Sequence, residues 1–154
     1  MGPSNCLRTE RVGIVSQAVA QISNRSTEGP VRNNAELVRE ARRLTKERRE
    51  RERMFPAVLF ADPAWDILLD LTISKLEGVR VSVLSLCLAA PVPTTTAFRW
   101  IRRMEAKGLL VRTPDEADRR RIYIDLNDQM LATMVAYLDR VAARERATGD
   151  SWPC

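Results

Sequence analysis

Histidine is missing from this sequence of 154 residues. Because histidine is the usual general base near neutral pH and the commonest metal ligand, its absence argues against hydrolytic and metal-dependent catalysis. Three cysteines are present, Cys6, Cys87 and Cys154, and no two of them form a CxxC pair. An odd number of scattered cysteines is typical of reduced thiols and not of a disulfide framework. We therefore predict a protein that is not an enzyme and has no catalytic residue, metal site or cofactor.

The position of Cys87 allows two interpretations. It lies in the apolar segment LSLCLAA, where a cysteine commonly serves as a small buried hydrophobic residue. The alternative is a redox sensor, which requires an accessible thiol with a lowered pKa. The sequence favours the buried residue.

Long apolar runs are also missing. No run approaches the ~18 residues that cross a bilayer, and the opening residues MGPSNCLRTERVG lack the apolar segment of a signal peptide. We predict a cytoplasmic protein that does not bind membranes. The length allows one ordinary domain, and 45% hydrophobic residues are enough for its core. The polar residues 1–32 predict a flexible leader.

Positive charge is concentrated in two blocks. The net charge is +5, and residues 39–53 and residues 94–121 each hold eight Lys and Arg against four acidic residues. Such clusters indicate a polyanionic partner. For residues 39–53 two interpretations stay open: an exposed helix with Glu–Arg pairs at helical spacing, or a helix that docks on a partner or on the DNA backbone.

The order of predicted elements is that of a winged helix-turn-helix. Capping residues, prolines, glycines and apolar periodicity set the expected boundaries. The expected elements are a helix from Asn33 or Asn34, a helix from Asp62-Pro63 to Gly78, a strand at 79–83, a short helix ended by Pro91, a helix at 94–106, strands at 109–113 and 122–126, and a last helix capped by Asn127.

The predicted fold class is mainly α with a small β-hairpin wing, a winged helix-turn-helix with flanking N- and C-terminal dimerisation helices. Four parts follow along the chain. We expect a flexible leader at 1–32, a basic N-terminal helix and connection at 33–60, the DNA-binding domain at 61–127, and a C-terminal dimerisation helix and tail at 128–154.

The helix at 94–106 has the pattern of a recognition helix. Ala97, Trp100, Ile101 and Met104 form an inward stripe, which leaves short polar and cationic side chains to face the edges of DNA bases. The candidate contacts to the major groove are Thr94, Thr95, Thr96, Arg99, Arg102 and Arg103. The alternative is that the threonines only cap the helix and the arginines are solvated surface.

A charged loop follows at about 112–122 and predicts the wing. Arginine on a projecting loop suits the minor groove or the DNA backbone, and a neighbouring carboxylate can hold its guanidinium in position. The candidate wing contacts are Arg119, Arg120 and Arg121.

Residues 62–127 resemble the MarR-like transcriptional regulators. The shared motifs are Thr96, Arg99, Met104, Glu105, Gly108 and Leu109 in the helix and its exit, and Asp115, Asp118, Arg120, Ile124 and Leu126 in the wing. Ala117 stands where many members have the minor-groove arginine, so that role can pass to Arg119 or Arg120. Phe98 replaces a small polar residue, and either contacts a thymine methyl group or packs against the protein or a partner.

The resemblance implies a homodimer that binds duplex DNA in a sequence-specific manner, with the terminal helices forming the dimer interface. It allows for a small-molecule effector, which the sequence does not identify. Both flanking helices have apolar stripes that nothing obvious in the winged domain covers, which also predicts a homodimer; the alternative is that these helices fold back on their own domain.

The same residues allow other functions. A winged helix can serve as a protein-interaction module, with the basic helix 39–53 binding an acidic partner, or as a non-specific DNA-binding accessory protein. A metal-dependent enzyme is the weakest rival. Asp115, Glu116 and Asp118 are acidic, but neighbouring arginines disfavour a bound cation.

Overall fold

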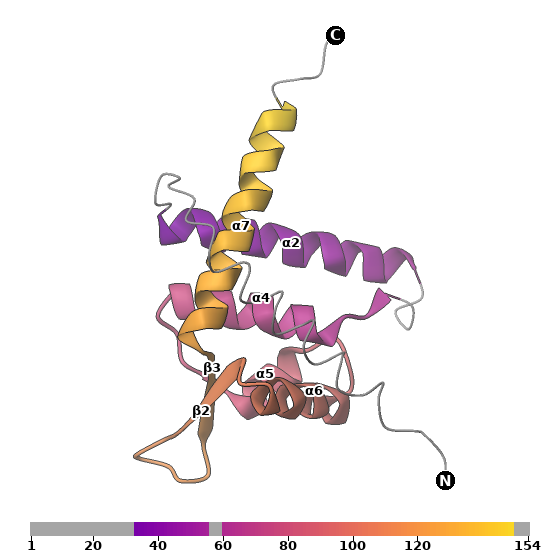
Figure 1. Ribbon diagram of the computed structural model, residues 1–154. Coiled ribbons are helices and arrows are strands. Elements are labelled where there is room, and N and C mark those ends of the chain that lie inside the picture. The colour runs from indigo at the N-terminus through magenta and orange to yellow at the C-terminus, as the bar shows by residue number, and fades with distance from the viewer. Residues whose placement is uncertain (1–32, 56–59, 150–154) are drawn as a thin grey trace, which may run out of the picture. The chain divides into compact units, whose positions relative to one another are not determined.

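The structure, a computed structural model, describes residues 33–55 and 60–149; the predicted leader 1–32 lies outside them. Its fold is mainly helical with a three-stranded antiparallel sheet, which confirms the predicted winged helix-turn-helix fold, mainly α with a small β-hairpin wing (Figure 1). The elements are α2 (Asn34–Met54), α4 (Pro63–Leu76), β1 (Val81–Ser82), α5 (Val83–Ala89), α6 (Thr94–Ala106), β2 (Leu110–Pro114), β3 (Ile122–Leu126) and α7 (Asp128–Gly149).

The helices begin at the residues that the sequence marks as caps. Asn33 Oδ1 accepts a hydrogen bond from the Ala35 amide at 2.9 Å, and Asp62 Oδ1 accepts one from the Trp65 amide at 3.2 Å. A side-chain acceptor at these positions satisfies amides that have no partner within the helix. Asn127 caps α7 in the same way, with the Met130 amide as donor.

Two of the three strands were predicted with the wrong boundaries. The strand expected at 79–83 is reduced to Val81–Ser82, because Ser82 Oγ accepts from the Ser85 amide at 3.0 Å and starts α5 at Val83. The second strand begins at Leu110 and not at Leu109. There the chain leaves α6 through Gly108, whose φ is 70°, and the Leu109 amide still donates to the Met104 carbonyl at 3.0 Å.

The flanking helices bury their apolar stripes within the chain. Helix α2 packs on α4 and α7, and Leu37, Ala41, Met134 and Leu138 are at most 3% exposed. The inner residues of both stripes therefore pack on their own domain, while Met130, Leu131 and Val135 of α7 stay partly exposed. Neither flanking helix, nor any other in the described part of the chain, combines the length and apolarity needed to span a membrane.

The sheet places the wing beside α6. Strand β3 lies between β1 and β2, and its Ile124 and Leu126 are buried in the core. Helix α6 buries Ala97 and Ile101 in the same core. Because α6 and the β2–β3 hairpin pack on one core, the outer face of α6 and the tip of the hairpin keep a fixed position relative to each other (Figure 1).

Candidate nucleic-acid interface

Helix α6 has one buried and one exposed face. Ala97, Ile101 and Met104 are 4% exposed or less, and Trp100 is half-buried. At 100° per residue the opposite face carries Thr95, Arg99 and Arg102, and the side chains of these three are exposed. The helix thus presents one polar side chain and two cations away from the core.

The threonines in the first turn of α6 do not cap the helix, so their hydroxyl groups are available to a ligand. Pro93 is the N-cap, and no side chain caps the helix. The Thr96 and Ala97 amides donate to the Pro93 carbonyl at 2.8 and 3.0 Å, and Thr94 and Thr95 are exposed. The alternative in which the threonines serve as caps is therefore not supported. The positive end of the helix dipole lies beside their hydroxyl groups.

A groove of about 790 Å³ runs between α5, α6 and the hairpin. It brings together residues that the sequence marked in two separate segments. Five of the nine predicted contacts line it: Thr94, Thr95, Arg99, Arg120 and Arg121. Its apolar lining comes from Val83, Leu84, Cys87, Phe98 and Ile122.

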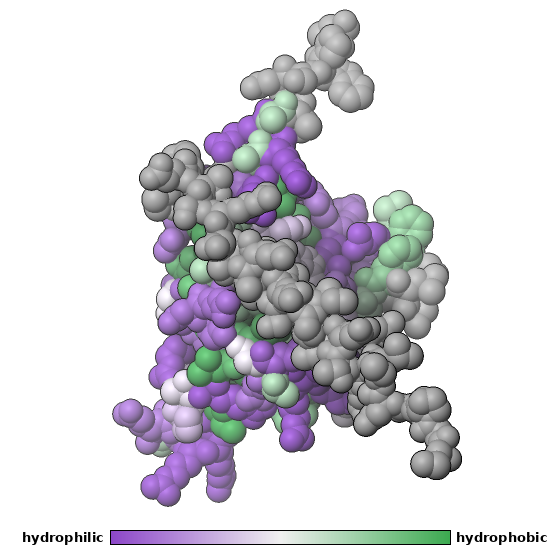
Figure 2. Space-filling view, viewed as in Figure 1, coloured by the Kyte–Doolittle hydropathy of each residue, from purple (hydrophilic) through white to green (hydrophobic). Residues whose placement is uncertain are grey.

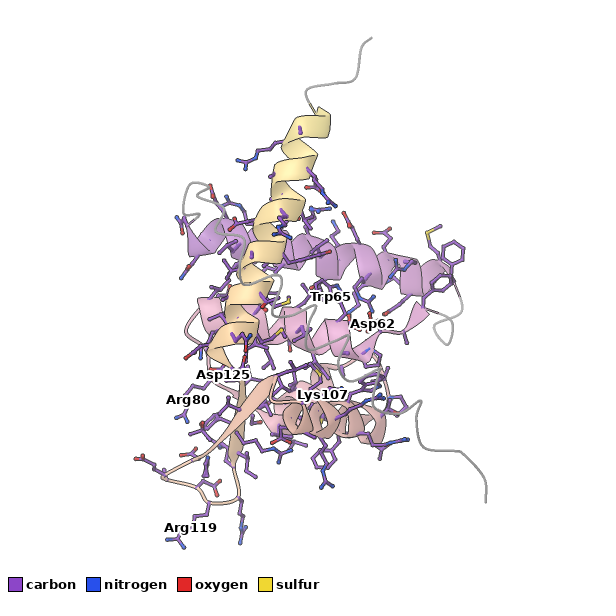
Figure 3. All side chains as sticks on the ribbon, in the orientation of Figure 1. Asp62, Trp65, Arg80, Lys107, Arg119 and Asp125 are labelled. Carbon is purple, nitrogen blue, oxygen red and sulfur yellow. The ribbon has the colours of Figure 1, made fainter. Side chains whose placement is uncertain are left out.

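The other four predicted contacts lie outside this lining. Thr96 is half-buried. The Arg102 guanidinium lies 6.0 Å from the centre of the Phe98 ring, and that of Arg103 lies 5.3 Å from the Trp100 ring, both within the range of a cation–π contact. Arg119 is exposed at the tip of the hairpin (Figure 3).

The acidic residues of the wing hold its turn. Asp115 Oδ1 accepts from the Ala117 amide at 3.0 Å, and Asp118 Oδ1 accepts from the Arg120 amide at 3.0 Å. The Ala117 amide, then the Tyr123 hydroxyl and the Arg121 and Arg80 guanidinium groups, hold the pKa of Asp115 below its ordinary value. Asp115 is therefore an ionised acceptor for the turn. The described residues contain no group of acidic and cysteine side chains placed to hold a metal ion.

Hydrophilic residues cover the tip of the hairpin (Figure 2). Arg119, Arg120 and Arg121 are exposed there, and the Arg121 guanidinium lies 3.7 Å from Asp115. Hydrogen bonding to the Tyr123 hydroxyl and the negative charge of Asp115 raise the pKa of Arg121. The wing therefore presents a fixed positive charge to solvent.

One cation of the groove and one beside the hairpin were missed from the sequence. Arg112 lines the groove, pairs with Glu105 of α6, and lies 6.0 Å from the Phe98 ring. The sequence signal that could have identified Arg112 was its position in a strand of alternating apolar residues. Arg80 precedes β1 and lies beside the hairpin, with its guanidinium 3.7 Å from the Tyr123 ring (Figure 3). No local pattern links Arg80 to the wing.

Cys87 faces the core side of the groove. Its side chain is 3% exposed, and burial raises the pKa of its thiol, against the opposing effect of Arg112. A buried thiol with a raised pKa is a poor nucleophile. The structure thus favours the interpretation of Cys87 as a small buried hydrophobic residue over that of a redox sensor.

Most of the cations of residues 39–53 on α2 form ion pairs with acidic side chains. Arg43 pairs with Glu40, Glu47 and Glu145, while Arg42 pairs with Glu77 at 2.6 Å. These contacts lie within α2 and between α2 and its neighbours. The first interpretation of residues 39–53, a helix with compensating charges, agrees with this arrangement.

The comparison with protein families matches residues 71–122 to the model of the MarR family. This confirms the resemblance inferred from the sequence. The match covers about a third of the chain and runs from α4 to the first residue of β3. It therefore spans the helix-turn-helix and the wing tip. A comparison with curated proteins gives no match.

Two solved structures of MepR share the fold. One is a mutant from a multidrug-resistant S. aureus clinical isolate, 14% identical, with a TM-score of 0.50 over 98% of this chain and 86% of that chain. The other is an S. aureus MepR mutant bound to an oligodeoxyribonucleotide, 15% identical, with a TM-score of 0.50 over 97% and 86% of the two chains. At these identities the likeness establishes the architecture of the chain.

Proposed function

We propose that this MarR-like chain is a homodimeric transcriptional regulator that binds duplex DNA in a sequence-specific manner and catalyses no reaction. The observation that carries the proposal is the groove, where Thr94, Thr95 and Arg99 of α6 meet Arg120 and Arg121 of the wing. Hydroxyl and guanidinium groups are the side chains that most often contact phosphates and base edges. No cofactor is needed for this activity.

Helix α6 is proposed to enter the major groove. An α-helix fits the width of that groove, and its N-terminal residues reach the base edges in helix-turn-helix proteins. Arg99 is exposed on the face opposite the core, where its guanidinium can donate two hydrogen bonds to guanine. Thr94 and Thr95, at the positive end of the helix, suit the flanking phosphates.

The wing, at about 112–122, is proposed to lie on the minor groove or the backbone. The negative potential of a narrow minor groove attracts arginine. Ala117 cannot supply that contact, and Arg119 at the tip is a replacement that the sequence already suggested. Arg120 and Arg121 line the side of the wing toward α6, which suits the backbone between the two grooves.

A dimer is proposed on grounds other than the buried helix stripes. Met54 and Phe55 at the end of α2 and the nearby Phe60 are 73%, 50% and 37% exposed, and the Phe55 and Phe60 rings lie 5.4 Å apart. Aromatic and methionine side chains are enriched in the cores of interfaces. A twofold dimer would read two half-sites about one helical turn apart, so a selected binding site should contain an inverted repeat.

Replacing Arg99 with alanine tests the role of α6. If Arg99 reads a base, the variant should lose roughly 1–3 kcal/mol of binding free energy on its selected site and accept other bases at one position. The measurement is fluorescence anisotropy on the selected duplex and on a random-sequence pool at one salt concentration. Arg140→Ala is the control, since Arg140 is an exposed arginine on α7 that does not line the groove and is not among the predicted contacts.

The two outcomes separate different roles. A loss confined to the selected site supports base readout. Equal weakening on every sequence would assign Arg99 to a phosphate, and this would move the proposal toward the non-specific accessory protein. No binding by the unmodified protein, even at low salt, would favour the protein-interaction module.

A further inference from the structure

A chain of three side chains connects the wing tip to the body of the domain. It consists of Arg80, which precedes β1, Tyr123 in β3, and Asp115 at the start of the tip. Asp115 and Tyr123 belong to one hairpin, whereas Arg80 comes from a distant segment of the sequence that the sheet brings beside them. We call them the wing brace.

Arg80 stacks on Tyr123. Its guanidinium carbon lies 3.7 Å from the centre of the ring, whereas the other arginine–ring contacts of the described residues lie at 5.3 to 6.0 Å. Ser82 of β1 is opposite Tyr123, and Arg80, two residues before Ser82, is the diagonal neighbour of Tyr123 on the same face of the sheet. A cation over the face of an aromatic ring is attracted by the ring's quadrupole.

Tyr123 in turn holds Asp115. Its hydroxyl donates to Asp115 Oδ2 at 3.1 Å, while Asp115 Oδ1 accepts from the Ala117 amide at 3.0 Å. The Asp115 side chain is only 13% exposed. Each of its oxygens therefore has one fixed donor, one from the strand and one from the turn.

The tip has few other restraints: its side-chain contacts are the Asp118 carboxylate, which accepts from the Arg120 amide at 3.0 Å, and the Arg121 guanidinium, 3.7 Å from Asp115. Beyond the last strand pair, Pro114 and Ile122, its backbone bonds run from the Asp115 amide to the Arg121 carbonyl at 3.0 Å and from the Arg121 amide to the Asp118 carbonyl at 2.8 Å. Residues 116–121 are all exposed. An exposed loop that must become ordered on binding loses affinity through conformational entropy, and a loop ordered beforehand does not.

We propose that Tyr123 is a positioning residue for DNA binding, which fixes the wing tip through Asp115 and so orders the wing arginines before DNA arrives. The inference rests on the proposed function, since an ordered wing tip matters only if the wing binds DNA. Tyr123 itself need not contact DNA. Arg80 keeps the Tyr123 ring in place and adds a positive charge beside the hairpin.

The test is the full-length Tyr123→Phe variant, which removes one hydroxyl and keeps the ring under Arg80. Two properties are measured: amide hydrogen exchange of Ala117 and Arg121 in the DNA-free protein, and affinity, dissociation rate and salt dependence with a selected duplex. Tyr137→Phe is the matched control. Tyr137 lies on α7 against Trp65, with ring centres 5.1 Å apart, and has the same hydroxyl to lose.

We expect faster exchange at the tip and an affinity about 3- to 10-fold lower in Tyr123→Phe, in line with the loss of one hydrogen bond. The loss should appear in the dissociation rate, and the salt slope should stay unchanged because no charge is removed. Tyr137→Phe should match the unmodified protein in every measurement.

Three results would overturn the inference. Unchanged exchange would show that the brace does not order the tip. Faster exchange with unchanged DNA affinity would leave Tyr123 with a structural role only. In both cases the unmodified protein still binds DNA and the proposed function stands. Absence of DNA binding by the unmodified protein would reject the proposed function, and the positioning role with it.

Discussion

Replacing Arg48 with methionine is expected to lower the free energy of unfolding by about 3 to 5 kcal/mol. Arg48 of α2 forms a two-point ion pair with Asp66 of α4, from Nε to Oδ1 at 2.8 Å and from Nη2 to Oδ2 at 3.1 Å. Both residues are 8% exposed. The variant would leave the Asp66 carboxylate buried without its partner, and that desolvation dominates the cost.

The pair holds the flanking helix to the domain. Arg48 Nη2 also donates to the Asp62 carbonyl at 3.4 Å, just before α4 begins. The hydrogen bond to Asp66 is the main reason that the pKa of Arg48 is raised. Losing Arg48 therefore weakens the contact of α2 with the start of α4 as well as the pair itself.

Urea unfolding at one fixed protein concentration gives the measurement, because association would otherwise change the apparent stability. Arg53→Met is the control, an exposed arginine on the same helix, and should change stability by less than about 0.5 kcal/mol. The double variant Arg48→Met with Asp66→Leu should regain much of the loss. Equal effects of Arg48→Met and Arg53→Met would contradict this role of the pair.

Removing the three wing arginines is expected to have the largest effect on DNA binding. The change of Arg119, Arg120 and Arg121 to alanine should reduce the slope of log affinity against log salt by up to about 2.7, which is about 0.9 for each phosphate that the wing no longer neutralises. The physical reason is that each cation on a phosphate releases counterions. Fluorescence anisotropy of a random duplex pool at several salt concentrations measures the slope.

A second triple variant tests whether the position of the three cations matters, or only the loss of three positive charges. Arg39, Lys46 and Arg53 on α2 are exposed, and their change to alanine removes the same charge from a helix that packs on α4 and α7. This variant should keep the slope of the unmodified protein. Equal reductions in both variants would indicate non-specific attraction. Insensitivity to loss of the wing arginines would favour the protein-interaction module.

The elements of the winged helix could be predicted because proline and glycine mark their ends. Helix α6 runs from Thr94 to Ala106 and β3 from Ile122 to Leu126, both as expected. Pro93 starts the helix, and Gly108, at a φ of 70°, ends it. The strand before α5 was less predictable, since the side chain of Ser82 converts part of an apolar run into a helix.

The sequence identified which residue types form the candidate DNA-binding site, but only part of their arrangement in space. Helical spacing identifies Arg99 on the exposed face, but it does not show that Arg103 stacks on Trp100 while Arg120 reaches the groove. The pairs of Arg48 with Asp66 and of Arg80 with Tyr123 depend on tertiary packing and strand register. Neither pair has a signal within one segment of the sequence.

Methylation interference on a duplex selected from a random pool tests the central claim most directly. Dimethyl sulfate modifies guanine N7 in the major groove and adenine N3 in the minor groove. If α6 reads the major groove and the wing the minor groove, guanine methylation should block binding within each half-site and adenine methylation should block it at the flanks. Binding that tolerates guanine methylation at every position would contradict the placement of α6 in the major groove.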